Sequence, residues 1–175
     1  TMIALATIIL FSACKKKENE ALKDNPFVTE WDTPYGVPPF DKIKNEHYLP
    51  AFEEGIRQQL EEIDAICNNK EKPTFENTIE ALEYSGALLY KVSLVFFNLT
   101  EAVNSPELEA LSEKITPLVT KHSDDISLNV KLFERIKTVY DQREGMNLDP
   151  VQLRLLEETY KSFVRGGANV PAEKQ

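Results

Sequence analysis

The 175-residue chain is predicted to fold as an all-α, multi-helix antiparallel bundle. Two observations predict this class. From residue 25 onward, apolar residues recur at steps of three and four, which is the period of one face of a helix. No apolar-polar alternation extends beyond four residues, and no Asn-Gly or Asp-Gly pair offers a hairpin turn. The length suits one domain with a sizeable core.

The two longest helices are expected first. One spans about residues 45–67 and carries a single apolar stripe. The next is opened by Pro73 and Thr74 and continues to about residue 103, with two apolar stripes side by side, so we expect it to pack on two sides. Gly86 lies inside this second helix, where a missing side chain would let a neighbouring helix come close.

Three shorter helices complete the bundle. Ser105 is the expected N-cap of the third, with Pro106 at its first helical position. The fourth spans about residues 127–140. The fifth begins at the Asp-Pro pair at 149–150 and ends at the Gly-Gly pair at 166–167.

Composition excludes several classes of function. Lys and Arg number 20 against 29 Asp and Glu, which gives a formal net charge of -9. Phosphate binding needs clustered cations, so nucleic acid is not expected as a partner. Two cysteines and two histidines indicate neither a disulfide framework nor a four-ligand structural zinc site.

The first residues predict where in the cell the protein is located. Residues 2–11 are almost wholly apolar and are followed by Ser12, Ala13 and Cys14, a pattern typical of a bacterial lipoprotein signal. We therefore interpret residues 1–14 as a signal peptide, Cys14 as a lipid anchor to a membrane, and residues 15–24 as a polar tether. The protein would then be lipid-anchored or periplasmic in the cell envelope; an ordinary secretory signal or a short buried segment is the alternative.

Residue chemistry alone gives no active site. The chain has no His-Glu-x-x-His, no Gly-x-Ser-x-Gly and no P-loop. We interpret His47 as a cap at the start of the first helix and His122 as part of a polar helix end, in preference to metal ligands. Cys67 lies on an apolar stripe and is interpreted as a buried free thiol, since no base is near it in sequence.

Residues 31–40 are predicted to form a rigid structural strap. Prolines fix φ and hold the chain extended, and large aromatic side chains supply apolar anchors. The residues concerned are Trp31, Pro34, Tyr35, Pro38, Pro39 and Phe40.

Five segments, in this order, resemble a known family. They are NPF at 25–27, TPYGVPPFDKIKNEHYLPAFEEGI at 33–56, PTFENTIEALE at 73–83, NSPELEAL at 104–111 and LDPVQLRLLEETYKSFVRGGANV at 148–170. Together they resemble the N-terminal region of the peptidyl-dipeptidase (dipeptidyl carboxypeptidase) and oligopeptidase A family, which are thimet-oligopeptidase-like zinc metallopeptidases.

The resemblance implies a role for the whole chain. Residues 25–170 would be the N-terminal helical lobe of a larger, two-lobed zinc peptidase that cleaves dipeptides from the C-terminus of short peptides. The lobe would narrow the substrate channel, and the strap would lie across the catalytic region or line the channel. The zinc ligands and catalytic residues would belong to a missing C-terminal region, so the chain would be a fragment with a truncated end at residues 171–175. The alternative is a stand-alone helical peptide- or protein-binding lipoprotein without catalysis.

Overall fold

The computed structural model describes residues 20–103 and 105–170, and every regular element in these ranges is helical. The predicted all-α class is therefore confirmed. None of the described helices is both long enough and apolar enough to cross a bilayer. The elements are η1 (Glu20–Leu22), η2 (Pro26–Val28), η3 (Pro34–Gly36), α1 (Asn45–Asn68), η4 (Phe75–Glu80), α2 (Ala81–Glu83), α3 (Ala87–Ala102), α4 (Pro106–Ser127), α5 (Val130–Asp141), η5 (Arg143–Gly145) and α6 (Pro150–Gly166).

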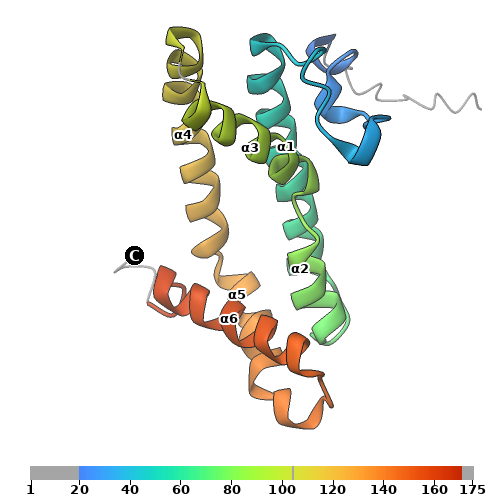
Figure 1. The fold of residues 1–175 in the computed structure, drawn as a ribbon. Coiled ribbons are helices and arrows are strands. Elements are labelled where there is room, and N and C mark those ends of the chain that lie inside the picture. Colours follow the sequence, from blue (N-terminus) through green and yellow to red (C-terminus); the bar gives the residue numbers. More distant parts are fainter. Residues whose placement is uncertain (1–19, 104, 171–175) are drawn as a thin grey trace, which may run out of the picture.

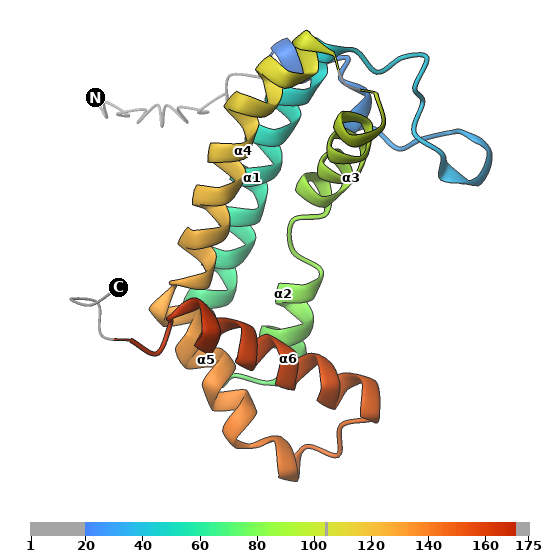
Figure 2. The ribbon, with the colours of Figure 1, turned by 60° about the vertical axis from the view of Figure 1, so that its left-hand side comes forward.

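The molecule is elongated, with α1 running along much of its length (Figure 1). The α2–α3 segment returns antiparallel to α1, and α4 then runs beside α1 in the same direction as α1 (Figure 2). Helix α5 continues past the end of α4, and α6 turns back over α5. The strap protrudes at the opposite end from α5 and α6 (Figure 2).

Helix α1 follows the prediction closely. Its start is capped by His47, whose Nδ1 accepts a hydrogen bond from the backbone N–H of Lys44 at 3.0 Å, so the interpretation of His47 as a cap is confirmed. The helix ends at Asn68, one residue beyond the expected stop.

The prediction of one continuous helix over residues 74–103 is wrong. Residues Phe75–Glu80 form a π-helix, and the chain leaves helical geometry again at Gly86, where φ is +74°. The Gly86 N–H donates to Glu62 Oε2 at 2.7 Å, outside its own helix. A left-handed backbone favours glycine, so this residue breaks the segment and starts α3 instead of extending a single helix.

Gly55 is where two helices come closest. A Cβ atom at Gly55 would lie 2.8 Å from both the Cα and the backbone N of Leu89, so α1 and α3 meet backbone to backbone. The close approach that we expected at Gly86 is also present, because a Cβ atom there would lie 2.4 Å from the side chain of Gln59 on α1.

The shorter helices are fixed by side-chain caps. Ser105 Oγ accepts from the N–H of Leu108 at 3.3 Å, as predicted for the start of α4. Asn129 caps α5 in the same way, which moves its start to Val130, three residues later than predicted. Asp149 caps α6 by accepting from the N–H groups of two following residues at 2.7 and 2.9 Å. Gly167 ends α6 with a φ of +95°.

Two apolar cores lie along the molecule, and α1 contributes to both. The first joins η2, the N-terminal half of α1, α3 and α4. Its buried residues are Phe27, Tyr48, Ala51, Phe52, Leu89, Val92, Val95, Phe96, Leu108 and Ile115. The second joins the C-terminal half of α1, the π-helix, α5 and α6, and its buried residues are Ile63, Ile66, Phe75, Ile79, Leu132, Phe133, Ile136, Val139, Leu156, Phe163 and Ala168.

A small polar network connects α1, α4 and the break before α3. Gln59 Nε2 donates to Ser85 Oγ at 3.1 Å, and Gln59 Oε1 lies 2.8 Å from His122 Nε2. Ser85 Oγ itself donates to the Leu82 carbonyl at 2.7 Å, so it accepts from Gln59. The Gln59 oxygen therefore faces His122, and Nε2 of the imidazole carries the proton.

His122 is only 5% exposed, which corrects our interpretation of it as part of a polar helix end. Its Nδ1 is buried and has no hydrogen-bond partner among the described residues. Burial lowers the pKa of His122, an effect that nearby Asp125 opposes and Lys121 reinforces. A second proton would place a charge on an atom without an acceptor.

We predict that Gly55→Ala destabilises the fold. Alanine gains about 1 kcal/mol in helix propensity, but overpacking against a backbone costs about 1–3 kcal/mol, and the backbone of Leu89 cannot rotate away as a side chain could. The free energy of unfolding, measured in guanidinium chloride, should fall. Gly145→Ala is the matched control, since nothing lies within 4 Å of a Cβ atom there. Equal stability of the two variants would contradict the close packing.

We predict that stability falls as the solution is acidified through the range of an ordinary histidine. The unfolded chain binds the His122 proton at a higher pH than the folded chain does, because the folded-state pKa is lowered. Stability is therefore full above the unfolded pKa and decreases as the pH falls below it. Urea unfolding between pH 5 and 8 measures this slope, and His122→Gln should reduce it. An unchanged slope in that variant would refute the assignment to His122.

Candidate functional site

The chain entering the strap is fastened by Asn25 and Phe27. Asn25 Oδ1 accepts from the Phe27 N–H at 3.0 Å, and Asn25 Nδ2 donates to the His47 carbonyl at 2.8 Å. Phe27 is 1% exposed, and its ring centroid lies 5.4 Å from that of Tyr48 in the first core. This turn therefore ties the start of the strap to the first turn of α1.

Trp31 and Lys91 join the strap to α3. Trp31 Nε1 donates to the Pro26 carbonyl at 2.8 Å. Lys91 Nζ reaches from α3 to donate to the carbonyls of Phe27 (3.1 Å) and Thr29 (2.7 Å), and it lies 4.2 Å from the centre of the Trp31 ring. Burial lowers the pKa of Lys91, and the charge of Glu30 opposes that shift. The Lys91 ammonium thus contacts the Phe27 carbonyl, the Thr29 carbonyl and the Trp31 ring at the same time.

The tip of the strap is a tight turn in an uncommon conformation. Tyr35 has φ +60° and ψ +16°, Gly36 has φ +66°, and the Val37 N–H closes the turn onto the Pro34 carbonyl at 3.3 Å. A left-handed backbone at an aromatic residue costs on the order of 1–2 kcal/mol. The Tyr35 side chain is fully exposed at 103%, so within the described chain no tertiary packing offsets this cost.

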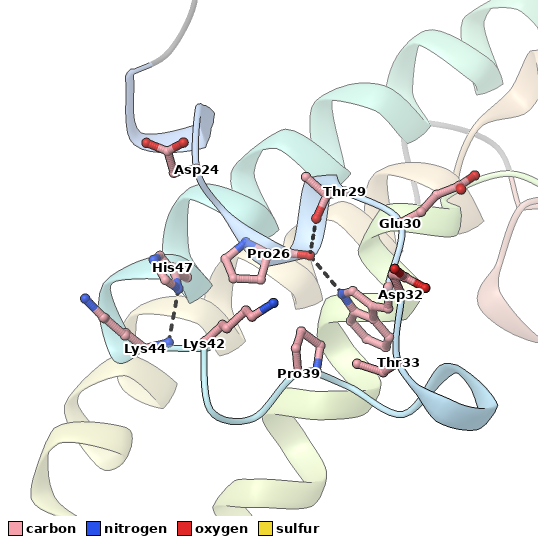
Figure 3. Close-up of a pocket in the computed structure, with 11 residues that line it drawn as sticks. Asp24, Pro26, Thr29, Glu30, Asp32, Thr33, Pro39, Lys42, Lys44 and His47 are labelled. Carbon is pink, nitrogen blue, oxygen red and sulfur yellow. Dashed lines mark hydrogen bonds between the residues drawn. The ribbon is translucent and has the colours of Figure 1, made fainter.

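The strap returns to α1 past a polar hollow of about 510 Å³ (Figure 3). Its wall carries the carboxylates of Asp24, Glu30 and Asp32 and the ammonium groups of Lys42 and Lys44. Both signs of charge occur, and the hollow is open to solvent. We therefore see in it a solvated edge of the strap and no selective binding site.

The other side of the strap borders an apolar groove of about 640 Å³. The groove lies between the strap and the outward face of α3. Its wall is mostly aliphatic and aromatic, and consists of Trp31, Gly36, Pro38, Phe40, Tyr90, Lys91, Leu94, Val95, Asn98, Leu99 and Ala102. Phe40, Tyr90 and Leu94 are exposed by 53%, 67% and 47%, so large apolar side chains gather at the surface along this groove.

The strap residues named from the sequence divide into two groups. Pro39 is buried and Trp31 and Pro38 are half-buried, so these three pack on the described chain. Tyr35 and Phe40 are exposed in the described chain, and their expected role as apolar anchors of a strap across the catalytic region stays a prediction. Cys14, the signal peptide, residues 15–19 of the tether and residues 171–175 lie outside the described residues. Residues 20–22 of the tether form the turn η1, which packs against α1.

The titratable side chains among the described residues that line the groove are those of Tyr90 and Lys91. The Lys91 ammonium is hydrogen-bonded to the carbonyls of Phe27 and Thr29. Elsewhere, Cys67 is half-buried, and burial followed by the nearby charge of Asp64 raises the pKa of its thiol, which keeps it protonated. Over residues 20–103 and 105–170, no three His, Cys, Asp or Glu side chains are grouped as a metal site requires.

Sequence reasoning missed the contribution of α3. Helix α3 contributes Tyr90, Lys91 and Leu94 to the groove wall, yet none of them stood out as a site residue. The available signal was that both Tyr90 and Leu94 fall outside the two stripes that fill the core, which leaves α3 apolar on its solvent side as well.

The chain resembles bacterial peptidases over most of its length. It is 43% identical over 152 residues to the dipeptidyl carboxypeptidase of Salmonella typhimurium, which is 87% of this chain and 22% of that protein. It is 44% identical over 146 residues to the dipeptidyl carboxypeptidase of Escherichia coli strain K12, covering 83% of this chain and 21% of the relative. Oligopeptidase A of the same strain is 26% identical over 143 residues, again 21% of its length.

The chain thus spans about a fifth of the length of the curated relatives that it matches. The matched part is their N-terminal region, so the resemblance read from the sequence motifs is confirmed. No family model matches the chain.

We predict that Lys91→Met loosens the strap. Methionine keeps the apolar stem and loses two hydrogen bonds and the ring contact, so the free energy of unfolding should fall by about 1–2 kcal/mol. Limited proteolysis should cut residues 31–40 several-fold faster in Lys91→Met than in the unmodified protein. Lys121→Met is the control, since the exposed Lys121 pairs with Asp125 one turn away and should matter by less than about 0.5 kcal/mol. Equal cleavage rates in both variants would count against the role of Lys91.

Proposed function

Because this chain is homologous to the N-terminal region of the dipeptidyl carboxypeptidases and of oligopeptidase A, we propose that it is the N-terminal helical lobe of a peptidase of the same kind. The parent protein cleaves dipeptides from the C-terminus of short peptides. The observation that carries the proposal is the identity to the two dipeptidyl carboxypeptidases, which exceeds that to oligopeptidase A and favours the reaction of the former.

The role proposed for the described chain is to shape and support the enzyme. A rigid bundle with an apolar groove and no reactive cluster suits a wall that narrows a substrate channel and carries a neighbouring lobe. The strap would lie across that neighbour, and the support is that Trp31 and Pro39 pack on the described chain while Tyr35 and Phe40 are exposed.

Zinc belongs to the parent enzyme in this proposal. The described residues do not fit a zinc site, so we assign none of the catalytic chemistry to them. When bound in such a peptidase, zinc supplies an activated water for attack on the peptide carbonyl.

We further propose that the protein is held in the cell envelope by a lipid on Cys14. The support is the sequence pattern at residues 2–14 and the Lys-rich segment that follows it. Two acyl chains would suffice for stable attachment. Membrane fractionation of the protein and of Cys14→Ser measures this directly, and equal membrane retention of the two would disprove it.

The proposed function predicts an active chimera. Residues 25–170 replace the matching N-terminal region of the dipeptidyl carboxypeptidase of Escherichia coli. Dipeptide release from an N-terminally blocked tetrapeptide should stay within about tenfold of the unmodified enzyme, which is about 1.4 kcal/mol in the barrier. The same enzyme with this region deleted is the control and should be inactive.

A folded, zinc-loaded chimera that releases no dipeptide would contradict the proposal. Reading the gene downstream of residue 175 gives an independent check, because a peptidase of this kind needs a His-Glu-x-x-His segment. Its absence would favour the alternative, a helical binding lipoprotein without catalysis.

A further inference from the structure

We propose that the groove between the strap and α3 is a docking site for an apolar segment of the same polypeptide, from the region that follows the described bundle in the parent protein. The inference rests on the proposed function, since it requires such a region. It goes beyond that function by naming the surface, the residues and the kind of occupant.

The groove is already prepared for an apolar occupant. Three of its polar side chains are hydrogen-bonded within the described chain: Trp31 Nε1 donates to the Pro26 carbonyl, Lys91 Nζ to the carbonyls of Phe27 and Thr29, and Asn98 Nδ2 to the Leu94 carbonyl at 2.6 Å. An apolar segment entering the groove can therefore cover these three groups without breaking their hydrogen bonds. It also removes Phe40, Tyr90 and Leu94 from water, which is favourable in proportion to the apolar area covered.

The strap side of the groove is held in shape before anything binds. Trp31 is fixed by the Pro26 carbonyl and by Lys91, and the prolines limit the backbone. A preorganised surface loses little conformational entropy on docking. The turn at Tyr35 and Gly36 stands beside the groove with its aromatic side chain in solvent. Strained, exposed side chains of this kind are found where a contact outside the segment uses them.

Charge argues for a polypeptide segment over a substrate peptide. A peptide cleaved near its C-terminus presents a free carboxylate, which needs an available cation. The ammonium of Lys91 is hydrogen-bonded to the carbonyls of Phe27 and Thr29, and the other residues that line the groove carry no positive charge. The groove thus suits an uncharged stretch of a chain whose termini lie elsewhere.

The relatives supply the source of the occupant. Each extends over about five times the length that this chain matches, so most of the parent polypeptide remains to be packed against this bundle. Helix α6 ends far from the strap (Figure 1), so we expect the docked segment to come from later in the parent polypeptide.

The test uses the full-length parent protein with a cysteine introduced by Leu94→Cys. Maleimide labelling at position 94 is followed by peptide mass spectrometry in the native protein and in guanidinium chloride. Docking predicts labelling on the order of 100-fold slower in the native state, at all protein concentrations and with or without peptide substrate. Val151→Cys is the control, because Val151 is 77% exposed on α6 and away from the groove.

Three results would overturn the proposal. Native labelling at position 94 as fast as in denaturant means that the groove is open. Protection that disappears on dilution to the monomer means that a second copy covers the groove. Protection that appears only with added substrate means that the groove binds peptides. Peptidase activity is measured on the same samples, so an active but unprotected protein refutes the docking alone, and a protected but inactive one refutes the proposed function alone.

Discussion

The backbone contact between α1 and α3 at Gly55 sets the geometry of the upper half of the molecule. With no side chain between them, the two helices approach until Leu89 meets the α1 backbone. That approach buries one face of α3 in the first core and turns the face carrying Tyr90 and Leu94 outward. The outward face then meets the strap, and the groove is the space that remains between them. A larger residue at position 55 would displace α3 and change the groove with it.

The strap is held by a few directional interactions and not by a large apolar contact of its own. Asn25 fixes its start, Phe27 inserts into the core, and Lys91 draws the following carbonyls and the Trp31 ring onto α3. The ammonium of Lys91 is thereby used entirely for structure. The result is an apolar surface whose strap side is held in one conformation by hydrogen bonds. A surface of this kind loses little conformational entropy when another segment docks on it.

Sequence reasoning could predict elements wherever the local signal was strong and unopposed. The caps at Ser105 and Asp149, the cap by His47 and the end at Gly167 all act within a few residues, and each was found. The break at Gly86 depends on Glu62 and Gln59, which come from a different helix, so no local pattern could show it. The burial of His122 has the same origin, because Gln59 is distant in sequence. Of the groove, only the strap side was predicted, from the spacing of its prolines and aromatic residues. The side formed by α3 became evident only from the packing of the helices.

The two cores share one continuous helix, and this has a consequence for how the molecule comes apart. Each core taken alone has about the size at which a folded unit is marginal. Because α1 forms part of both, loss of one core removes a packing partner from the other through the same rod of backbone hydrogen bonds. We therefore expect the two ends of the molecule to unfold together, because both depend on α1.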